Sequence, residues 1–401
     1  MLKVYQAIEL ILSRTKTLGK EKVELLSSLD RTLAEDIYSD IRIPPFDFSA
    51  LDGYVVVSSD VKGAYQEYPK TLRVIGELPA GSISPQTLSS GQAIKIMTGA
   101  PIPEGADAVV GVENTEAEGE MVRIFKEVGP GSNIHYTGES VEIGEKVLAE
   151  GDIIGAAEIG MLASLGRGEV EVIRRPKVVV IATGDELVEI DEELSPGKIR
   201  GSNSYSLTAL LLKYGGLPIW LGMVSDDKDK LREKIEENLD QADMIITSGG
   251  VSMGEYDIVK DVLKEMGEML YWGVAMRPGT MNAFGTIGDK LFFGLPGNPA
   301  SSMISFLQFV RPAIMKMSGL PPRPLPEVQA VLDEEVRVRK EYRYFVRVHL
   351  RQSGSIYHAS QKGPRGAGIL KSMVMADGLL VVPEDVDFIP AHEMARIQLI
   401  R

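Results

Sequence analysis

Short apolar segments alternate with segments of helical periodicity between residues 177 and 319, and this alternation constrains the fold more than any other feature. The apolar segments are KVVVIATG, LPIWLGMV, ADMIITSGG and KLFFGL. The predicted helices between and after them are NSYSLTALLLKYGG, DKDKLREKIEENLDQ, YDIVKDVLKEMG and NPASSMISFLQFVRPAIMKMSG, the last a single long helix with Pro312 inside it. Strands that alternate with helices predict a parallel sheet covered by helices on both faces.

The chain has other patterns on either side of this region. Val4, Ile8, Ile11 and Leu12 recur at helical spacing, so an amphipathic helix is expected at the N-terminus. Short strand-like segments separated by Pro and Gly between residues 71 and 125 predict a compact β module. A proline-rich linker at residues 320–326 precedes a second β region. The sequence therefore predicts a multidomain protein of the α/β plus β class.

Composition excludes several classes of function. The net charge of −14 and the pI of about 5.0 argue against a nucleic-acid-binding surface. The chain has no cysteine, so thiolate metal sites and a cysteine nucleophile are excluded, and its histidines are too scattered for a zinc site. Glu9 interrupts the first apolar run, so a signal peptide is not expected, and no stretch approaches the ~20 apolar residues of a membrane span. We therefore expect a soluble, cytoplasmic protein without nucleic-acid or membrane partners.

Acidic residues follow several of the predicted strands. Asp185 and Glu186 lie in ATGDEL, Asp226 follows LPIWLGMV, and Asp257 ends the segment TSGGVSMGEYD. Open parallel sheets bind ligands outside the carboxyl ends of their strands, and glycine turns that lead into helices favour anions. Carboxylates beside an anion site are explained if Mg²⁺ bridges them to the anion, because Mg²⁺ is commonly held by one or two carboxylates and substrate phosphates.

The same loops have two other interpretations. The acids could simply cap helix N-termini, as Asn298 is expected to do before Pro299 in GLPGNPASS. The segment GVSMG, residues 250–254, also matches the G-x-S-x-G nucleophile elbow of α/β-hydrolases. A hydrolase is disfavoured because the strand ends near Thr247, helical spacing begins only after Asp257, and no histidine follows in the same region.

Several longer motifs identify a family. PPFDFSALDGY, MTGAPIPEGADAVV, ATGDEL, SGGVSMGEYD and GLPGNPASS together resemble the molybdopterin molybdenumtransferases, the family of MoeA and of the C-terminal part of gephyrin. The resemblance extends from the first helix to the final β region. It implies that the protein inserts molybdate, or tungstate, into adenylylated molybdopterin with Mg²⁺-dependent release of AMP.

The resemblance also implies an elongated subunit of four domains and a homodimer with its active site between the subunits. The expected domain bounds are residues 1–25 with 42–54 and 136–172 for the elongated N-terminal domain, 55–135 for an inserted β domain, 173–320 for the α/β domain, and 321–401 for a C-terminal β domain. The α/β domain would resemble the molybdopterin adenylyltransferases of the MoaB and Mog type, with a sheet rich in parallel pairs.

Individual residues receive expected roles from the same resemblance. Those expected to act in catalysis are Asp52, Thr98, Glu186, Asp226 and Asp257. The expected metal ligands are Asp185, Glu186, Asp226 and Asp257. The expected cofactor-binding residues are Thr183, Gly184, Ser248, Gly249, Gly250, Ser252, Gly254, Arg277, Pro296, Gly297, Asn298 and Pro299. Mg²⁺ would offset charge on the phosphoanhydride during its cleavage, and Thr98 and the glycine amides would orient oxyanions.

The chain departs from the usual family pattern near the expected anion site. The departures are Gly273, Arg277, Thr280 and Met281 in GVAMRPGTM, His135 and Ser140 in NIHYTGES, and Gly201 in GSN. Arg277 keeps a positive charge but is not equivalent to lysine at an anion contact. Tungstate therefore stands beside molybdate as an expected metal source.

A group of basic residues in the C-terminal region has two interpretations. The group comprises Arg343, Arg347, Lys362, Arg365 and Lys371. It is either ordinary solvated surface charge or a basic wall that faces the phosphate of the pterin.

Two other functions compete with metal insertion. The protein could be a molybdopterin adenylyltransferase, because the α/β region resembles one on its own, but the flanking domains argue against this. It could also be a non-catalytic scaffold of the gephyrin type, but the acids expected to bind metal would then have no role.

Overall fold

The computed structural model describes residues 1–251, 257–361 and 366–401. The chain forms two compact units, one made of Met1–Lys22 with Glu171–Arg401 and the other of Val23–Val170. The four-domain division expected from the sequence stays a prediction. No helix in the described part of the chain is long and apolar enough to cross a membrane.

A six-stranded mixed sheet lies at the centre of the first unit, in the order β16-β13-β17-β21-β20-β18. Its strands are β16 (Leu217–Val224), β13 (Lys177–Thr183), β17 (Met244–Ser248), β21 (Lys290–Leu295), β20 (Ala283–Ile287) and β18 (Glu268–Trp272). The first four strands pair in parallel, which confirms the predicted parallel pairing. β20 pairs antiparallel with β21, and β18 pairs antiparallel with β20. The sequence did not predict these two strands. A two-residue turn, Gly288–Asp289, joins β20 to β21, and a connection this short permits only antiparallel pairing.

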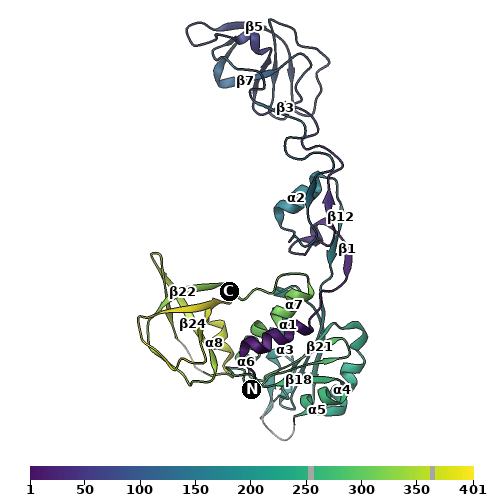
Figure 1. The fold of residues 1–401 in the computed structure, drawn as a ribbon, viewed down its shortest axis with the longest axis vertical. Coiled ribbons are helices and arrows are strands. Elements are labelled where there is room, and N and C mark those ends of the chain that lie inside the picture. Colours follow the sequence, from purple (N-terminus) through teal and green to yellow (C-terminus); the bar gives the residue numbers. More distant parts are fainter. Residues whose placement is uncertain (252–256, 362–365) are drawn as a thin grey trace. The chain divides into compact units, whose positions relative to one another are not determined.

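Helices cover both faces of this sheet, as the alternation predicted. They are α1 (Val4–Arg14), α3 (Ser202–Lys213), α4 (Lys228–Glu236), α5 (Ile258–Met266), α6 (Pro299–Ser305) and α7 (Arg311–Met317). Successive residues of β13 enter different cores, because side chains alternate across a strand. Val178 and Val180 pack with α1, α3, α6 and α7, whereas Val179 and Ile181 pack with α4 and α5. Figure 1 shows α1, α3, α6 and α7 grouped apart from α4 and α5.

The long helix predicted after β21 is present, with Pro312 inside it, but it contains a π-helical segment that was not predicted. A π-helical segment, Phe306–Val310, separates α6 from α7. Pro312 has no N–H to donate to a carbonyl one turn earlier. The backbone N–H of Arg311 instead bonds to the carbonyl of Phe306, five residues back, which accommodates the proline while the helix continues.

The C-terminal region of the same unit is a closed β structure. The sheet order is β19-β24-β25-β22-β28-β26, and β24 also pairs with β26, which closes the sheet on itself. Its strands are β19 (Met276–Arg277), β22 (Glu327–Leu332), β24 (Arg343–Ser353), β25 (Ile356–Ser360), β26 (Gly378–Val382) and β28 (Met394–Leu399). A short pair, β23 (Val336–Arg337) and β27 (Phe388–Ile389), and helix α8 (Leu370–Val374) complete it. The short strand β19 comes from the α/β part of the chain, so backbone pairing connects that part to the C-terminal sheet.

The second unit contains the β module predicted from the sequence. A six-stranded sheet has the order β7-β4-β6-β5-β9-β8. Its strands are β4 (Gly53–Val56), β5 (Lys70–Leu78), β6 (Gln92–Ile96), β7 (Ala108–Gly111), β8 (Thr115–Glu118) and β9 (Met121–Ile124). The unit also holds helix α2 (Ala156–Ser164) and the strand pairs β2 (Ile37–Tyr38) with β11 (Lys146–Leu148) and β3 (Phe48–Ser49) with β10 (Ile134–His135). The structure thus confirms the multidomain α/β plus β class.

Candidate functional site

The carboxyl ends of three parallel strands bring several predicted residues together in the first unit. β13 ends at Thr183, β17 at Ser248 and β21 at Leu295. The register pairs Ser248 with Leu295 and with Ala182, the residue before Thr183, so the three ends lie at one edge of the sheet. Gly249 is left-handed with φ 95°, and a Cβ there would lie 2.3 Å from the carbonyl oxygen of Thr183. Only glycine fits this close approach of two loops. The edge of the sheet is therefore lined largely by backbone.

Asn203, at the start of α3, connects two of these loops and was not predicted from the sequence. Its Nδ2 donates to Ser248 Oγ (2.9 Å) and to the carbonyl oxygen of Gly297 (2.7 Å). A carbonyl can only accept, so the orientation of the amide is fixed by its partners. Its Oδ1 is then a buried acceptor without a donor among the described residues. The Thr183 hydroxyl is also buried and has no hydrogen-bond partner among them. Such buried, unpartnered polar atoms at the end of a sheet suit a ligand.

The predicted acids after β13 and β16 are neighbours. Asp185 Oδ1 accepts from the backbone N–H of Asp226 at 3.0 Å, and the Glu186 side chain folds back over Gly184. Burial raises the pKa of Asp226, and the negative charges of Asp185 and Glu186 raise it further. The ammonium of Lys198 donates to the backbone carbonyl of Asp185. A cation placed here would relieve the repulsion among these carboxylates.

Asp257 occupies the N-cap of α5, as the capping interpretation predicted. Its side chain accepts from the backbone N–H of Lys260 at 3.2 Å, and the residue is buried. The predicted binding residues Ser252 and Gly254 lie outside the described residues. Within the described ranges no group of three acidic or histidine side chains could by itself enclose a metal ion. A site for Mg²⁺ would therefore need oxygens from substrate or water, which that ion usually retains.

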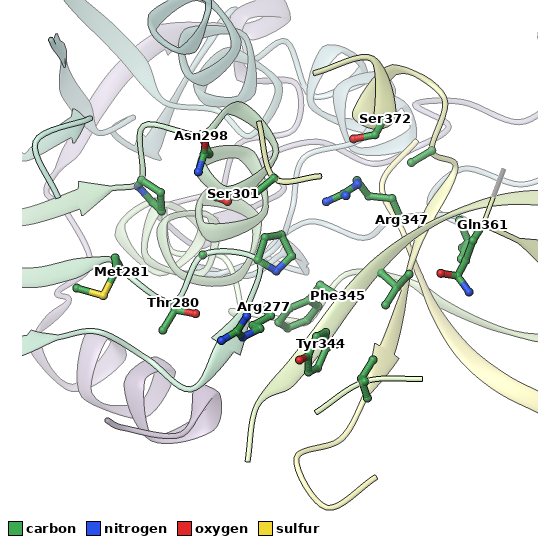
Figure 2. Close-up of a pocket in the computed structure, with 18 of the residues that line it drawn as sticks. Arg277, Thr280, Met281, Asn298, Ser301, Tyr344, Phe345, Arg347, Gln361 and Ser372 are labelled. Atoms are coloured by element: carbon green, nitrogen blue, oxygen red, sulfur yellow. The ribbon is translucent and has the colours of Figure 1, made fainter. Parts of the chain in front are cut away.

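The loop after β21 differs from its prediction in one detail. Pro299 begins α6, as expected, and Asn298 occupies the N-cap. The Asn298 side chain nevertheless makes no capping hydrogen bond, so the predicted cap was wrong. The side chain lies instead at the rim of a cavity, shown with Ser301 in Figure 2. Pro296 is buried, and Gly297 supplies the carbonyl that Asn203 contacts.

A cavity of about 620 Å³ lies between the loops of the α/β part and the C-terminal sheet. Its polar and charged lining comes from Arg277, Thr280, Asn298, Ser301, Arg337, Tyr344, Arg347, Gln361 and Ser372. Val251, Pro296, Gly297 and Asn298 also belong to the loops at the carboxyl edge of the sheet, so the cavity continues from that edge. Figure 2 shows Arg347 reaching from β24 toward the side that carries Asn298 and Ser301.

Arg347 is the most informative residue of this cavity. It is half-buried, its Nη2 donates to the carbonyl of Gly366 at 3.2 Å, and it has no carboxylate partner within the described parts of the chain. Burial lowers the pKa of Arg347, but a guanidinium stays protonated near neutral pH. A half-buried cation without an anion is costly unless a ligand supplies the opposite charge. The cavity is therefore suited to an oxyanion.

The other members of the predicted basic wall differ from Arg347. Arg343 pairs with Glu384 at 3.0 Å and does not line the cavity, so its charge is already balanced. Lys371 is exposed, as the surface-charge interpretation expected. Lys362 and Arg365 lie outside the described residues. The wall interpretation is thus supported at Arg347 and not at Arg343.

Asp52 and Thr98, each expected to act in catalysis, are in contact within the second unit. Asp52 Oδ1 accepts from the backbone N–H (2.8 Å) and the hydroxyl (2.9 Å) of Thr98. These hydrogen bonds hold the pKa of the exposed Asp52 carboxylate below its usual value. The pair presents a fixed negative charge at the surface of this unit.

The departures from the family pattern have local structural explanations. The Thr280 hydroxyl donates to the Met276 carbonyl at 2.6 Å and so braces the loop that carries Arg277. Gly201 is buried against the Met223 side chain. A Cβ atom at position 201 would lie 2.5 Å from the Met223 sulfur. His135 pairs with Glu139 through Nδ1.

The backbone roles of the other departures are simple. Gly273 is left-handed, with φ 82°, and its N–H donates to the carbonyl of Asn282 at 2.8 Å. The N–H of Ser140 donates to the carbonyl of Ile43 at 2.9 Å. Neither contact involves the residues that line the cavity.

Sequence reasoning missed Asn203, Ser301 and Ser372. Asn203 ends the segment GSN that begins at Gly201, and it lies at the start of a predicted helix. That position could have identified it as a candidate site residue. Ser301 is only two residues after Pro299, within the GLPGNPASS motif. Ser372 lies in α8, for which the sequence offered no signal.

Comparisons with known proteins agree with this architecture along the chain. Three family models match: "MoeA N-terminal region (domain I and II)" over residues 2–166, "Probable molybdopterin binding domain" over residues 179–316, and "MoeA C-terminal region (domain IV)" over residues 329–399. The chain is 35% identical to the molybdopterin molybdenumtransferase of Bacillus subtilis over 387 residues, covering 95% of this chain and 90% of that protein. It is 37% identical to molybdopterin molybdenumtransferase 2 of Mycobacterium tuberculosis, covering 91% of each.

A solved structure is similar over the full length. The crystal structure of the molybdopterin biosynthesis MoeA protein from Pyrococcus horikoshii OT3 superposes with a TM-score of 0.84 at 32% identity and covers 100% of both chains.

Proposed function

Because this chain belongs to the molybdopterin molybdenumtransferase family, we propose that its cavity binds molybdate or tungstate and delivers the metal to adenylylated molybdopterin. Membership makes the protein a transferase of molybdenum cofactor biosynthesis. The finer statements, namely the oxyanion, the adenylylated substrate, Mg²⁺-dependent release of AMP and a cytoplasmic homodimer, are proposals.

The observation that carries the proposal is the charge of the cavity. The whole chain has a net charge of −14, yet Arg277 and Arg347 line one cavity and neither has a carboxylate partner in the described parts of the chain. Arg337 lines it too, but Glu335 balances its charge at 2.8 Å. Guanidinium groups are suited to oxyanions because their planar N–H donors match pairs of oxygens. A dianion such as molybdate would compensate the two unbalanced arginines.

The pterin nucleotide would lie along the adjoining edge of the sheet. The buried Asn203 Oδ1 and the Thr183 hydroxyl lack partners among the described residues, and the left-handed Gly249 brings two loops together there. Ligands of open α/β sheets bind at this edge. Because Pro296, Gly297 and Asn298 belong to both regions, a substrate on this edge would place its reacting end beside the cavity.

The acids beside this edge fit Mg²⁺ in donor type. Asp185, Glu186 and Asp226 offer hard carboxylate oxygens, and their mutual repulsion already raises the pKa of Asp226, after the larger effect of burial. These residues would hold the ion together with phosphate oxygens of the substrate. When bound, Mg²⁺ would supply charge neutralisation at the phosphoanhydride. Arg277 and Arg347 would orient the oxyanion, and the Asp52 carboxylate, fixed by Thr98, is proposed to take part as a base or an anionic contact.

The two competing functions receive less support. An adenylyltransferase confined to the α/β region would not need the cavity, much of which is lined by residues of the C-terminal sheet. A scaffold would not need unpaired arginines inside a cavity. Incubation with ATP and molybdopterin distinguishes the first alternative, because adenylylation without metal insertion would favour it.

The proposal is tested by measuring AMP release and bound metal with molybdate and tungstate offered side by side. Arg347→Ala should reduce both by about 10- to 100-fold, since hydrogen bonds to charged groups are worth about 1.5–3 kcal/mol. Arg351→Ala removes an exposed arginine four positions along the same strand and should behave as wild type. Equal activity of Arg347→Ala and Arg351→Ala would refute the cavity as the oxyanion site.

A further inference from the structure

The backbone that carries Arg277 is held rigidly. β19 pairs in parallel with β24, with Arg277 opposite Tyr344, and the N–H of Arg343 donates to the carbonyl of Ala275 at 3.0 Å. The following loop is closed by the Val274 N–H bond to the Thr280 carbonyl at 2.9 Å. This pairing fixes where the Arg277 side chain begins, on the wall of the cavity.

The side chain itself is held by an aromatic ring. Arg277 is exposed, and its guanidinium carbon lies 4.6 Å from the centre of the Tyr342 ring. No carboxylate in the described ranges holds it. A free arginine side chain loses about 2 kcal/mol of rotamer entropy when it becomes ordered. A ring that already holds the guanidinium reduces the part of this cost that ligand binding must meet.

The three arginines of the cavity are held in different ways. Arg337 lies 4.4 Å from the centre of the Phe388 ring, but it also pairs with Glu335, so its charge is not free. Arg347 is held by the carbonyl of Gly366. Arg277 stacks on the Tyr342 ring, and an aromatic ring orients the cation without neutralising it.

We propose that Tyr342 is a positioning residue, which stacks on Arg277 and holds its guanidinium ready for an oxyanion in the cavity. The inference rests on the proposed function, in which that cavity takes molybdate or tungstate. Tyr342 does not line the cavity, so it would act only through Arg277. The planar guanidinium is essential to this role, because lysine stacks less well on a ring. The Arg277 guanidinium and the Tyr342 ring would thus act as a pair.

The test is a double-mutant cycle on the full-length protein, with the affinities for sodium molybdate and sodium tungstate measured by calorimetry. Tyr342→Leu should weaken binding about two- to fivefold, the range expected of an exposed cation–π contact. Tyr342→Phe keeps the ring face and should bind as wild type does. In the background of Arg277→Ala, Tyr342→Leu should cause no further loss, because the group it positions is gone.

A control variant separates the role of Tyr342 from a general effect of removing a ring beneath an arginine. Phe125→Leu removes the ring beneath Arg123, 5.2 Å away in the second unit, and should leave oxyanion affinity unchanged. If Tyr342→Leu binds as wild type while Arg347→Ala binds weakly, the positioning role is overturned and the proposed function stands. An equal loss from Tyr342→Leu with and without Arg277 would also overturn it. If wild type binds neither oxyanion, both proposals fail.

Discussion

At the scale of the residue, one threonine holds the pKa of Asp52 below its usual value. The Thr98 N–H and hydroxyl both donate to the same carboxylate oxygen, at 2.8 and 2.9 Å. Asp52→Asn retains an oxygen that can accept both bonds but removes the charge. We expect AMP release to fall by about 100-fold or more, the typical contribution of a positioned acid or base, while the protein stays folded at pH 7. Asp60→Asn is the matched control, because Asp60 likewise accepts from one hydroxyl, of Ser90, and one N–H, of Gly91.

The lowered pKa of Asp52 adds a pH dependence with a defined sign. A carboxylate whose pKa is lower in the folded state stabilises the fold above its unfolded pKa, and this contribution is lost as the pH falls through the folded value. The melting temperatures of wild type and Asp52→Asn should therefore differ at pH 7 and converge below about pH 4. A difference that grows toward low pH, or full activity in Asp52→Asn, would contradict this account.

At the scale of the element, the π-helical segment connects the α/β helices to the C-terminal sheet. Gln308, in this segment, donates through Nε2 to Gln398 Oε1 of β28 at 3.0 Å, and Gln398 Nε2 donates to Glu327 Oε1 of β22 at 3.2 Å. A carboxylate can only accept, so both amide orientations are fixed. Both glutamines are buried. Gln308→Leu should lower the free energy of unfolding by about 1–3 kcal/mol, because it leaves a buried acceptor unpaired.

The double variant Gln308→Leu/Gln398→Leu separates lost hydrogen bonding from lost packing. Replacing both partners removes the unpaired acceptor, so the double variant should be more stable than the sum of the two single losses predicts. Urea unfolding at pH 7 measures the three variants. Additive losses would show that the amide pair does not join these elements.

At the scale of the whole molecule, a site shared between subunits predicts complementation. Asp52 belongs to the second unit and Arg347 to the first. If each site takes Asp52 from one subunit and Arg347 from the other, a mixture of Asp52→Asn and Arg347→Ala should regain activity. An equal, fully exchanged mixture contains about half mixed dimers, each with one intact site, so about a quarter of wild-type AMP release is expected.

The control for complementation is each variant exchanged with itself under the same conditions, which should keep its reduced activity. Light scattering should report a dimer of the 43.7 kDa chain throughout. A dimer whose mixture stays inactive would place both residues of a site in one subunit, and a fully active monomer would remove the shared site altogether.

The sequence by itself determined the α/β core and the candidate acids. Successive residues of β13 lie in two cores on opposite faces of the sheet. A strand buried on both faces needs an apolar residue at every position, so the apolar run alone identifies such a strand. The acids after β13 and β16 could be placed together because parallel strands end at the same edge of a sheet. The last helix was predicted with Pro312 inside it, but the π-helical segment that accommodates this proline was not predicted.

Only the tertiary structure decided which charges are available. Arg343 and Arg347 are four residues apart in β24 and, with alternation, on the same side of the strand. Arg343 nevertheless pairs with Glu384, whereas Arg347 faces a cavity. The addition of β19 to the C-terminal sheet likewise brings Arg277 onto the stacking face of Tyr342. These outcomes depend on contacts between segments distant in sequence, and periodicity carries no information about a distant partner.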